Sequence, residues 1–227
     1  PTFTLSQRGR AGMQLLGAVQ KYSTGVLRPI AAENFEANEQ GKALTAEHAS
    51  DPTGVSRDRI KAAREVAESD NVYRLERFFQ RWVGEENFNR GIPAIEERRE
   101  KFEAFNAAQS EEQLLGTLDL SKEVEVPKYY DRVEWHLEPG GWDGYDLYGA
   151  LFAYGVGPYV FSQGGYAAVG IGADITQQRV NAIKQFPKAS YGKIYEPGCG
   201  GVSTLKAVNT VFPEAELHGS DLSPLLL

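Results

Sequence analysis

The chain has 227 residues, of which 41% are hydrophobic and 24% charged, and its formal net charge is −7. This composition is that of an ordinary folded protein, and the length is sufficient to bury a sizeable core. The acidic balance and the lack of a basic stripe disfavour a nucleic-acid partner. The single cysteine, Cys199, excludes an internal disulfide and fits a reducing compartment, so we expect a cytoplasmic protein.

Residues 1–126 are interpreted as an N-terminal arm followed by a helical region. Small and polar side chains dominate residues 1–55, which indicates an arm or loop with one or two amphipathic turns around Leu16. Mixed charges in residues 56–112 are typical of solvated helix faces. The apolar positions that recur there at helical spacing are Val72, Leu75, Phe79 and Trp82, then Ile95, Phe102 and Phe105.

Gly84 and the segment 91–93 are expected to separate these two helices, because glycine and proline interrupt helical structure. The simplest interpretation of the region is helical packing or dimerisation. Further copies of the same chain are therefore one candidate partner, in a homo-oligomer.

Residues 127–173 form an aromatic, glycine-rich region. No charged side chain lies between Asp146 and Asp174, a run that first suggests a membrane span. Its glycines and Pro158 would weaken or break such a helix, so we predict short buried segments and no membrane span. Ordinary core and an apolar pocket wall both fit this pattern. The candidate substrate-binding residues are Tyr148, Phe152, Tyr159 and Tyr166.

Residues 174–227 predict a helix, a strand, a glycine turn, a second helix and a second strand. Asp174 is suited to cap the first helix, which carries Val180 and Ile183. The strands are expected near 193–196 and 216–221. A unit of this order joins two parallel strands by a right-handed crossover.

The glycine turn at 198–201 has a physical rationale. Glycine lacks a Cβ and tolerates positive φ, so backbone N–H groups can approach a ligand closely. The N-terminus of the following helix offers further unpaired N–H groups and favours negative charge. Asp221 ends the second strand, where a carboxylate can accept hydrogen bonds from the hydroxyls of a ribose. Together these features predict a bound nucleoside.

Two common nucleotide motifs fit less well. A dinucleotide fingerprint requires a third glycine, and Ser203 stands at that position. A P-loop requires Lys followed by Ser or Thr after its last glycine, and Lys206 has no such context.

The run from Ile194 to Gly201 (IYEPGCGG) resembles the first motif of class I S-adenosylmethionine (SAM)-dependent methyltransferases. The run from Gly219 to Pro224 (GSDLSP) is similar to the second motif of that family, and both occur in order at a suitable spacing. Val202 departs from the pattern, because many members carry a third glycine there. The resemblance covers residues 174–227, and it implies that residues 127–173, which precede the cofactor motif, lie on the substrate side of the site or form its lid.

The resemblance implies a Rossmann-like parallel sheet and SAM as the cofactor. It implies that Glu196 lies near the amino-acid end of SAM, that Asp221 holds the ribose and that Leu222 flanks the adenine. The cofactor-binding residues that it implies are Glu196, Gly198, Gly200, Gly201, Asp221 and Leu222. Cys199 is expected to pack within the loop rather than act as a nucleophile, because nothing around it supplies a base.

The expected function is methyl transfer from SAM to a small, apolar or aromatic molecule. His136 is a weak candidate for a catalytic base on the grounds of its ordinary pKa, although a lone histidine is more often structural. No metal ligand is assigned. Other classes stay open: a helical oligomerisation scaffold with a degenerate or incomplete cofactor fold, and an oxidoreductase that uses a dinucleotide.

Only two strands of the family's seven-stranded sheet are predicted before Leu227. A parallel sheet needs cover on both faces, so half of one is not expected to be stable alone. We therefore expect this chain to be the N-terminal part of a longer enzyme and to be inactive by itself.

Overall fold

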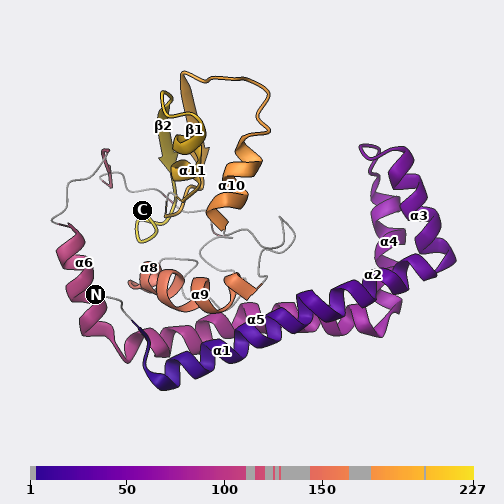
Figure 1. The fold of residues 1–227 in the computed structure, drawn as a ribbon, viewed down its shortest axis with the longest axis horizontal. Helices are drawn as coiled ribbons and strands as arrows, with labels where there is room; N and C mark the ends of the chain where they lie inside the picture. Colours follow the sequence, from indigo (N-terminus) through magenta and orange to yellow (C-terminus); the bar gives the residue numbers. More distant parts are fainter. Residues whose placement is uncertain are drawn as a thin grey trace.

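The protein is an α/β mixture that is mostly helical, with one two-stranded parallel sheet in the part described (Figure 1). The computed structural model describes residues 4–110, 116–120, 125, 128, 144–163, 175–201 and 203–227. The expected α/β class is confirmed at this level. Within the described residues, no helix combines the length and the apolar character that a membrane span would require.

Residues 1–55 are mainly helical, so the interpretation of this segment as an arm or loop is wrong. It contains α1 (Gln7–Tyr22), the π-helical segment η1 (Ser23–Leu27), α2 (Arg28–Ala37) and α3 (Glu39–Ser50). Side-chain caps begin two of these helices: Ser6 accepts the Gly9 N–H at 2.9 Å, and Asn38 accepts the Gln40 N–H at 3.0 Å. One face of α1 is buried, which stabilises a helix that contains the three glycines Gly9, Gly12 and Gly17.

The helix α5 (Asn71–Glu96) runs without interruption through Gly84, Gly91 and Pro93, so the expected separation into two helices is wrong. It follows α4 (Arg57–Ser69) and precedes α6 (Arg99–Ser110). A Cβ added at Gly91 would lie 2.4 Å from Leu151 Cδ1. This glycine therefore allows a neighbouring segment to approach the helix closely, and it does not end the helix.

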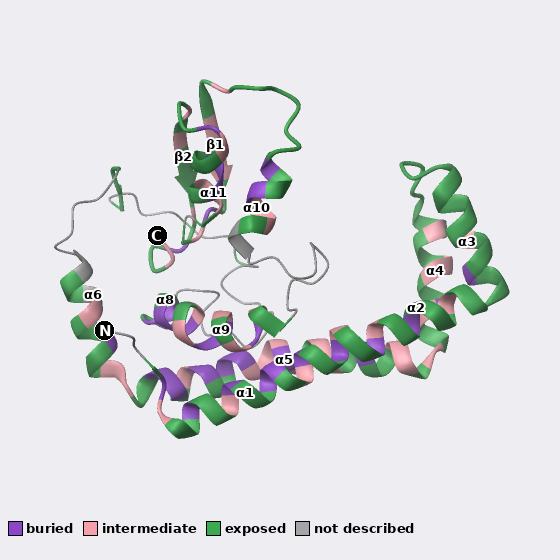
Figure 2. Cartoon of the chain, viewed as in Figure 1, coloured by how far each residue is buried: buried purple, intermediate pink, exposed green. Residues whose placement is uncertain are grey.

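Helices α1 and α5 lie antiparallel, with their buried faces turned toward each other (Figures 1 and 2). Gly9 faces Ala94 at one end, where an added Cβ would lie 2.8 Å from Ala94 Cβ. Further along, the Gln20 side chain donates to Gln80 at 3.3 Å. The buried core at this contact includes Met13, Leu16, Val83, Phe88 and Ile95.

Residues 144–163 pack on this helix pair as short helical segments, which confirms the prediction of short buried segments in the described part of the charge-free run. The segments are α8 (Tyr148–Ala150), η3 (Leu151–Val156), α9 (Gly157–Tyr159) and the 3₁₀ turn η4 (Phe161–Gln163). They add Leu151, Val156 and Val160 to the same core.

In the described part of the chain, both π-helical segments end two residues before a proline. Leu27 precedes Pro29 in this way, and Val156 precedes Pro158. Proline has no N–H to donate, and its ring clashes with the carbonyl four residues earlier. A wider turn at these two points lets the chain stay helical through each proline.

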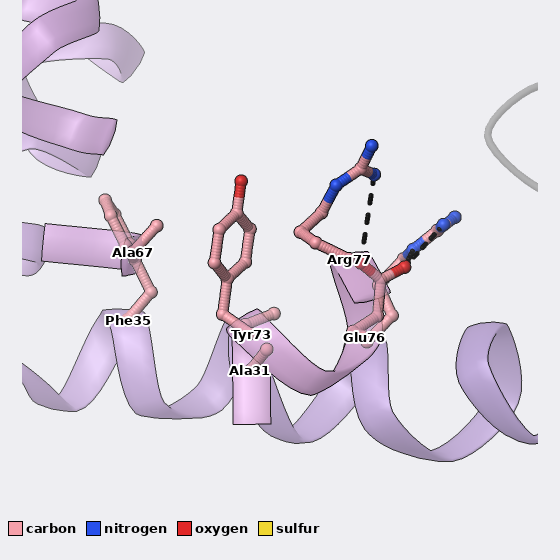
Figure 3. Close-up of a pocket in the computed structure, with 8 residues that line it drawn as sticks. Ala31, Phe35, Ala67, Tyr73, Glu76 and Arg77 are labelled. Atoms are coloured by element: carbon pink, nitrogen blue, oxygen red, sulfur yellow. Dashed lines mark hydrogen bonds and ion pairs between the residues drawn. The ribbon is translucent and has the colours of Figure 1, made fainter. Parts of the chain in front are cut away.

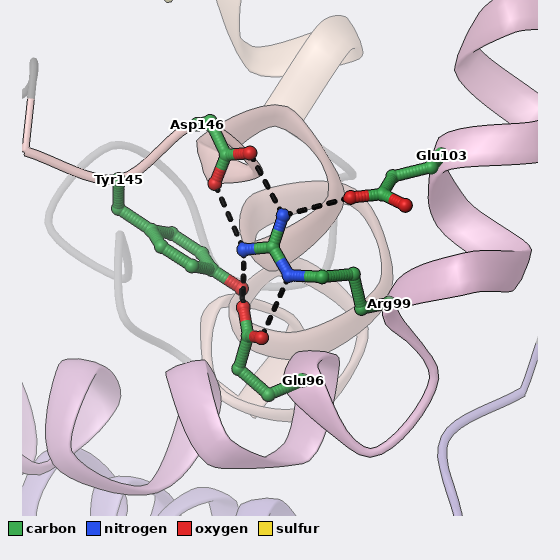
Figure 4. Close-up of polar contacts among 5 residues, drawn as sticks. All are labelled: Glu96, Arg99, Glu103, Tyr145 and Asp146. Atoms are coloured by element: carbon green, nitrogen blue, oxygen red, sulfur yellow. Dashed lines mark hydrogen bonds and ion pairs between the residues drawn. The ribbon is translucent and has the colours of Figure 1, made fainter.

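Arg99 links the start of α6 to the segment 144–163 (Figure 4). Its guanidinium donates two hydrogen bonds to Asp146, at 2.8 and 2.9 Å, and two to Glu96, both at 2.7 Å. Tyr145 donates to Glu96 at 2.9 Å. Hydrogen bonds from Arg99 hold the pKa values of Asp146 and Glu96 below their ordinary range, while burial and the Glu96 contact raise the pKa of Tyr145.

The C-terminal residues form the predicted series of helix, strand, turn, helix and strand. It contains α10 (Ile175–Ile183), β1 (Lys193–Pro197), α11 (Ser203–Val211) and β2 (Glu216–Ser220). The strands are parallel, with Glu196 paired to Gly219. Val180, Ile183, Ala207, Val208 and Phe212 form a second core under them. Leu226, near the end of the chain, packs instead against the first core.

Gly17→Ala is expected to destabilise the protein by roughly 1–3 kcal/mol, because the new methyl group must displace backbone. An added Cβ at Gly17 would lie 2.0 Å from the Tyr159 carbonyl oxygen, whereas one at Gly12 on the same helix meets nothing within 4 Å. Gly12→Ala is therefore the matched control and is expected to stabilise by about 0.5–1 kcal/mol. Urea unfolding of both variants measures the difference, and equal effects would contradict the close packing.

Acid is expected to weaken the attachment of residues 144–163. Because the pKa of Asp146 is lowered from 3.8 and that of Glu96 from 4.5, their contribution to the free energy of unfolding is complete above those ordinary values. It is lost as the pH falls below them through the lower folded-state values. Unfolding followed by tyrosine circular dichroism should therefore depend on pH less steeply below 4.5 in Arg99→Gln than in the wild type.

Lys101→Gln is the control for Arg99→Gln, since Lys101 is an exposed cation on the same helix. It should keep the wild-type pH dependence. An unchanged acid profile in Arg99→Gln would show that this cluster does not hold the segment.

Candidate functional site

The turn between β1 and α11 is a bend free of bulky side chains. Gly198 and Gly200 have φ values of +69° and +48°, in the left-handed region that favours glycine. A Cβ added at either position would meet no heavy atom within 4 Å. The outer surface of this bend is therefore open to a ligand.

Backbone hydrogen bonds attach the bend to the end of β2. The N–H groups of Gly198 and Cys199 donate to the Ser220 carbonyl at 2.7 and 3.0 Å. The Gly200 N–H donates to Asp221 Oδ2 at 2.8 Å, and the Ser223 N–H donates to Oδ1 at 2.9 Å. Each carboxylate oxygen of Asp221 thus accepts one backbone hydrogen bond and retains capacity for another.

Glu196 lies two residues before the bend, near the end of β1 (Lys193–Pro197). Its Oε2 atom is buried and has no hydrogen-bond partner among the described residues. A buried carboxylate oxygen without a donor carries a desolvation cost, which none of the described residues offsets. A ligand that donates a hydrogen bond at this point would remove that cost.

Cys199 packs beneath the bend, as the sequence predicted. It is 6% exposed, and a Cβ added at Gly219 would lie 2.7 Å from its Sγ. Burial, followed by the negative charges of Asp221 and Glu196, raises the pKa of this thiol. A raised pKa disfavours the thiolate, so the geometry argues against a nucleophilic cysteine.

The N-terminus of α11 receives a contact that the sequence did not indicate. Arg179 on α10 donates to the Ser203 hydroxyl at 2.6 Å. No motif marks Arg179, because its role depends on how α10 packs against α11. This arginine brings a positive charge to the helix end that follows the bend.

The remaining cofactor-site candidates lie around the same bend. Leu222 is 41% exposed. A Cβ added at Gly201 would lie 3.8 Å from the Leu226 carbonyl oxygen. The residues that the structure brings together at this bend are Glu196, Gly198, Gly200, Gly201 and Asp221.

The candidate substrate residues lie in the helical core. Tyr148 is fully buried, and its ring contacts those of Tyr145, Phe88 and Phe152. Phe152 and Tyr159 are partly buried against the same core. Tyr166 and the weak base candidate His136 lie outside the described residues. The described aromatic positions thus fit the core interpretation, with Phe152 and Tyr159 retaining some exposed surface.

Cys199 should react slowly with a thiol reagent in the native protein, because it is buried and its pKa is raised. Unfolding in urea at the same pH should accelerate the reaction by roughly tenfold or more. Cys199→Ser gives the background, since no other thiol is present. Equal rates in native and unfolded protein would contradict the packing role of this residue.

Comparison with known proteins does not assign a function to this site, because no protein-family model, curated protein or solved structure matches this chain.

Proposed function

We propose that the bend at 198–201 binds SAM and that this chain is part of a SAM-dependent methyltransferase with a Rossmann-like cofactor fold. The observation that carries the proposal is the hydrogen bond from the Gly200 N–H to Asp221 Oδ2. It joins a bend free of bulky side chains, which follows one strand, to the acid that follows its parallel neighbour. Ligands of open α/β sheets bind at such carboxyl ends of parallel strands.

The residues present fit the groups of SAM. Asp221 retains lone pairs for the two ribose hydroxyls, and the unpartnered oxygen of Glu196 suits the ammonium of the methionine part. Leu222 offers an exposed apolar side chain for the adenine ring. The open backbone at Gly198 and Gly200 lets the cofactor lie directly on the bend.

SAM supplies an activated methyl group on a sulfonium, so the chain mainly has to bind, orient and exclude water. The two carboxylates fix the orientation of the cofactor, because they take donors at opposite ends of it. The proposed acceptor is a small apolar or aromatic molecule. The partly buried rings of Phe152 and Tyr159 are the described side chains that support this choice.

A second candidate is a helical oligomerisation scaffold. Large apolar side chains on the long helices are exposed to solvent: Tyr22 is 50%, Leu75 43% and Phe78 59% exposed. Surfaces of this kind favour contact with another protein surface. A scaffold of this type would leave the bend without a ligand.

Asp221→Ala is expected to weaken SAM binding by about tenfold or more, because hydrogen bonds to a charged group are worth roughly 1.5–3 kcal/mol. Calorimetric titration of the full chain with SAM measures the change. Glu214→Ala is the matched control, since Glu214 is an exposed acid in the same unit and lies outside the bend. Unchanged affinity in Asp221→Ala would contradict the proposal.

Asp221→Asn removes the charge with a smaller change of shape than Asp221→Ala. The amide oxygen can accept only one of the two backbone N–H groups, from Gly200 and Ser223, that the carboxylate accepts, so this variant keeps part of the hydrogen bonding of the bend and should also weaken SAM binding. No heat of binding from the wild-type chain, together with a stable dimer in sedimentation, would favour the scaffold instead.

A further inference from the structure

A pocket of about 310 Å³ lies between α2, α4 and α5. Its apolar walls are Ala31, Ala32 and Phe35 from α2 and Ala67 from α4, and the ring of Tyr73 stands between them and the charged edge (Figure 3). This volume falls at the lower end of the range for small-molecule sites. The pocket shares no lining residue with the bend at 198–201.

Two arginines and one glutamate form the charged edge of the pocket. Glu76 is 3% exposed, and its Oε1 accepts hydrogen bonds from Arg28 Nε at 3.0 Å and Nη2 at 2.8 Å. Its Oε2 lies 3.8 Å from Arg77 Nη1. One carboxylate therefore faces two guanidinium groups, which leaves one positive charge uncompensated among the lining residues.

Both guanidinium groups reach solvent and retain donors. The side chains of Arg28 and Arg77 are 40% and 58% exposed, respectively. A guanidinium carries five N–H donors, and the contacts with Glu76 engage only some of them. These donors match the geometry of an incoming carboxylate.

The backbone next to the pocket is also unusual. Arg28 directly follows the π-helical segment η1, and π-helical turns occur frequently at functional sites. The buried Ser23 hydroxyl in this segment donates to the Glu76 carbonyl at 3.3 Å and accepts from Gln80 at 3.0 Å. The charged edge is thus held in place by contacts that come from two helices.

We propose that this pocket binds a small organic acid, with an apolar or aromatic body against Ala31, Phe35 and Ala67 and a single carboxylate on Arg28 and Arg77. The apolar walls exclude a strongly polar body, and the uncompensated positive charge selects an anion over a neutral or cationic molecule. The proposal is independent of the methyltransferase assignment, because it uses none of residues 175–227.

The test is a calorimetric titration of the full chain with phenylpropionate and with its uncharged amide, phenylpropionamide. We expect saturable binding of the acid and weaker binding of the amide. Arg77→Gln should lower the affinity for the acid by about tenfold or more, because it removes a charged hydrogen-bond donor and leaves the Arg28–Glu76 pair intact. Arg74→Gln, an exposed cation on the same helix outside the lining, should leave the affinity unchanged.

Ala32→Phe provides a second test that does not depend on charge. Ala32 is an exposed residue of the lining, so a larger side chain there should fill the pocket without disturbing a core. It should abolish binding of the acid and leave the circular dichroism spectrum unchanged. Any of the following would overturn the proposal: no saturable binding by the wild type, equal affinity for acid and amide, equal losses in the two arginine variants, or binding that survives Ala32→Phe.

Discussion

Close contact along α5 is the constraint on which the rest of the helical structure depends. At Gly91 this helix admits Leu151, and near Ala94 it lies directly against Gly9 of α1. A methyl group at Gly9 would meet Ala94 of α5 too closely, and one at Gly91 would require the buried Leu151 side chain to move. Because the segment 144–163 packs on both α1 and α5, its burial follows from the same contacts. The arrangement therefore depends on where side chains are missing as much as on the apolar side chains themselves.

Polar groups fix how the helices are aligned within this packing. Glu76 is buried on α5 and would be costly without its arginine partners, so α2 must lie where Arg28 can reach it. Arg99 does the same for the segment that begins at Asp146. Apolar contact alone tolerates sliding of one helix along another, whereas a hydrogen-bonded charge pair is satisfied in only one alignment.

The C-terminal unit has its own small core, and its own hydrogen bonds hold the bend at 198–201. The backbone of the bend is held by the Ser220 carbonyl and the Asp221 carboxylate, both of which follow from the parallel pairing of β1 and β2. Leu226 then packs against the helical core. This contact brings the end of the chain, next to Gly201, toward the aromatic residues of the segment 144–163.

The sequence by itself determined the order of elements in residues 175–227 and the residues that meet at the bend. Those features are local: glycines with positive φ, helix-forming periodicity and an acid at a strand end leave few alternatives over a short stretch. It also predicted that Cys199 packs, and that the described part of the charge-free run forms short buried segments. The assignment of SAM as the ligand stays a prediction.

Only the tertiary structure decided the helical half. Residues 7–50 contain many helix-forming residues, but glycines and Pro29 interrupt the pattern, and the burial of α1 against α5 is visible only in the tertiary structure. A glycine in a sequence can mark either the end of a helix or a close contact with a neighbouring segment. At Gly91 the adjacent Leu151 shows that the second applies. Arg28 and Glu76, like Arg179 and Ser203, are distant in sequence and meet only once their helices pack. The physical reason is the same in each case. These contacts depend on how the helices pack in three dimensions and on which charges then lie close together. The sequence shows only which residues are present to form them.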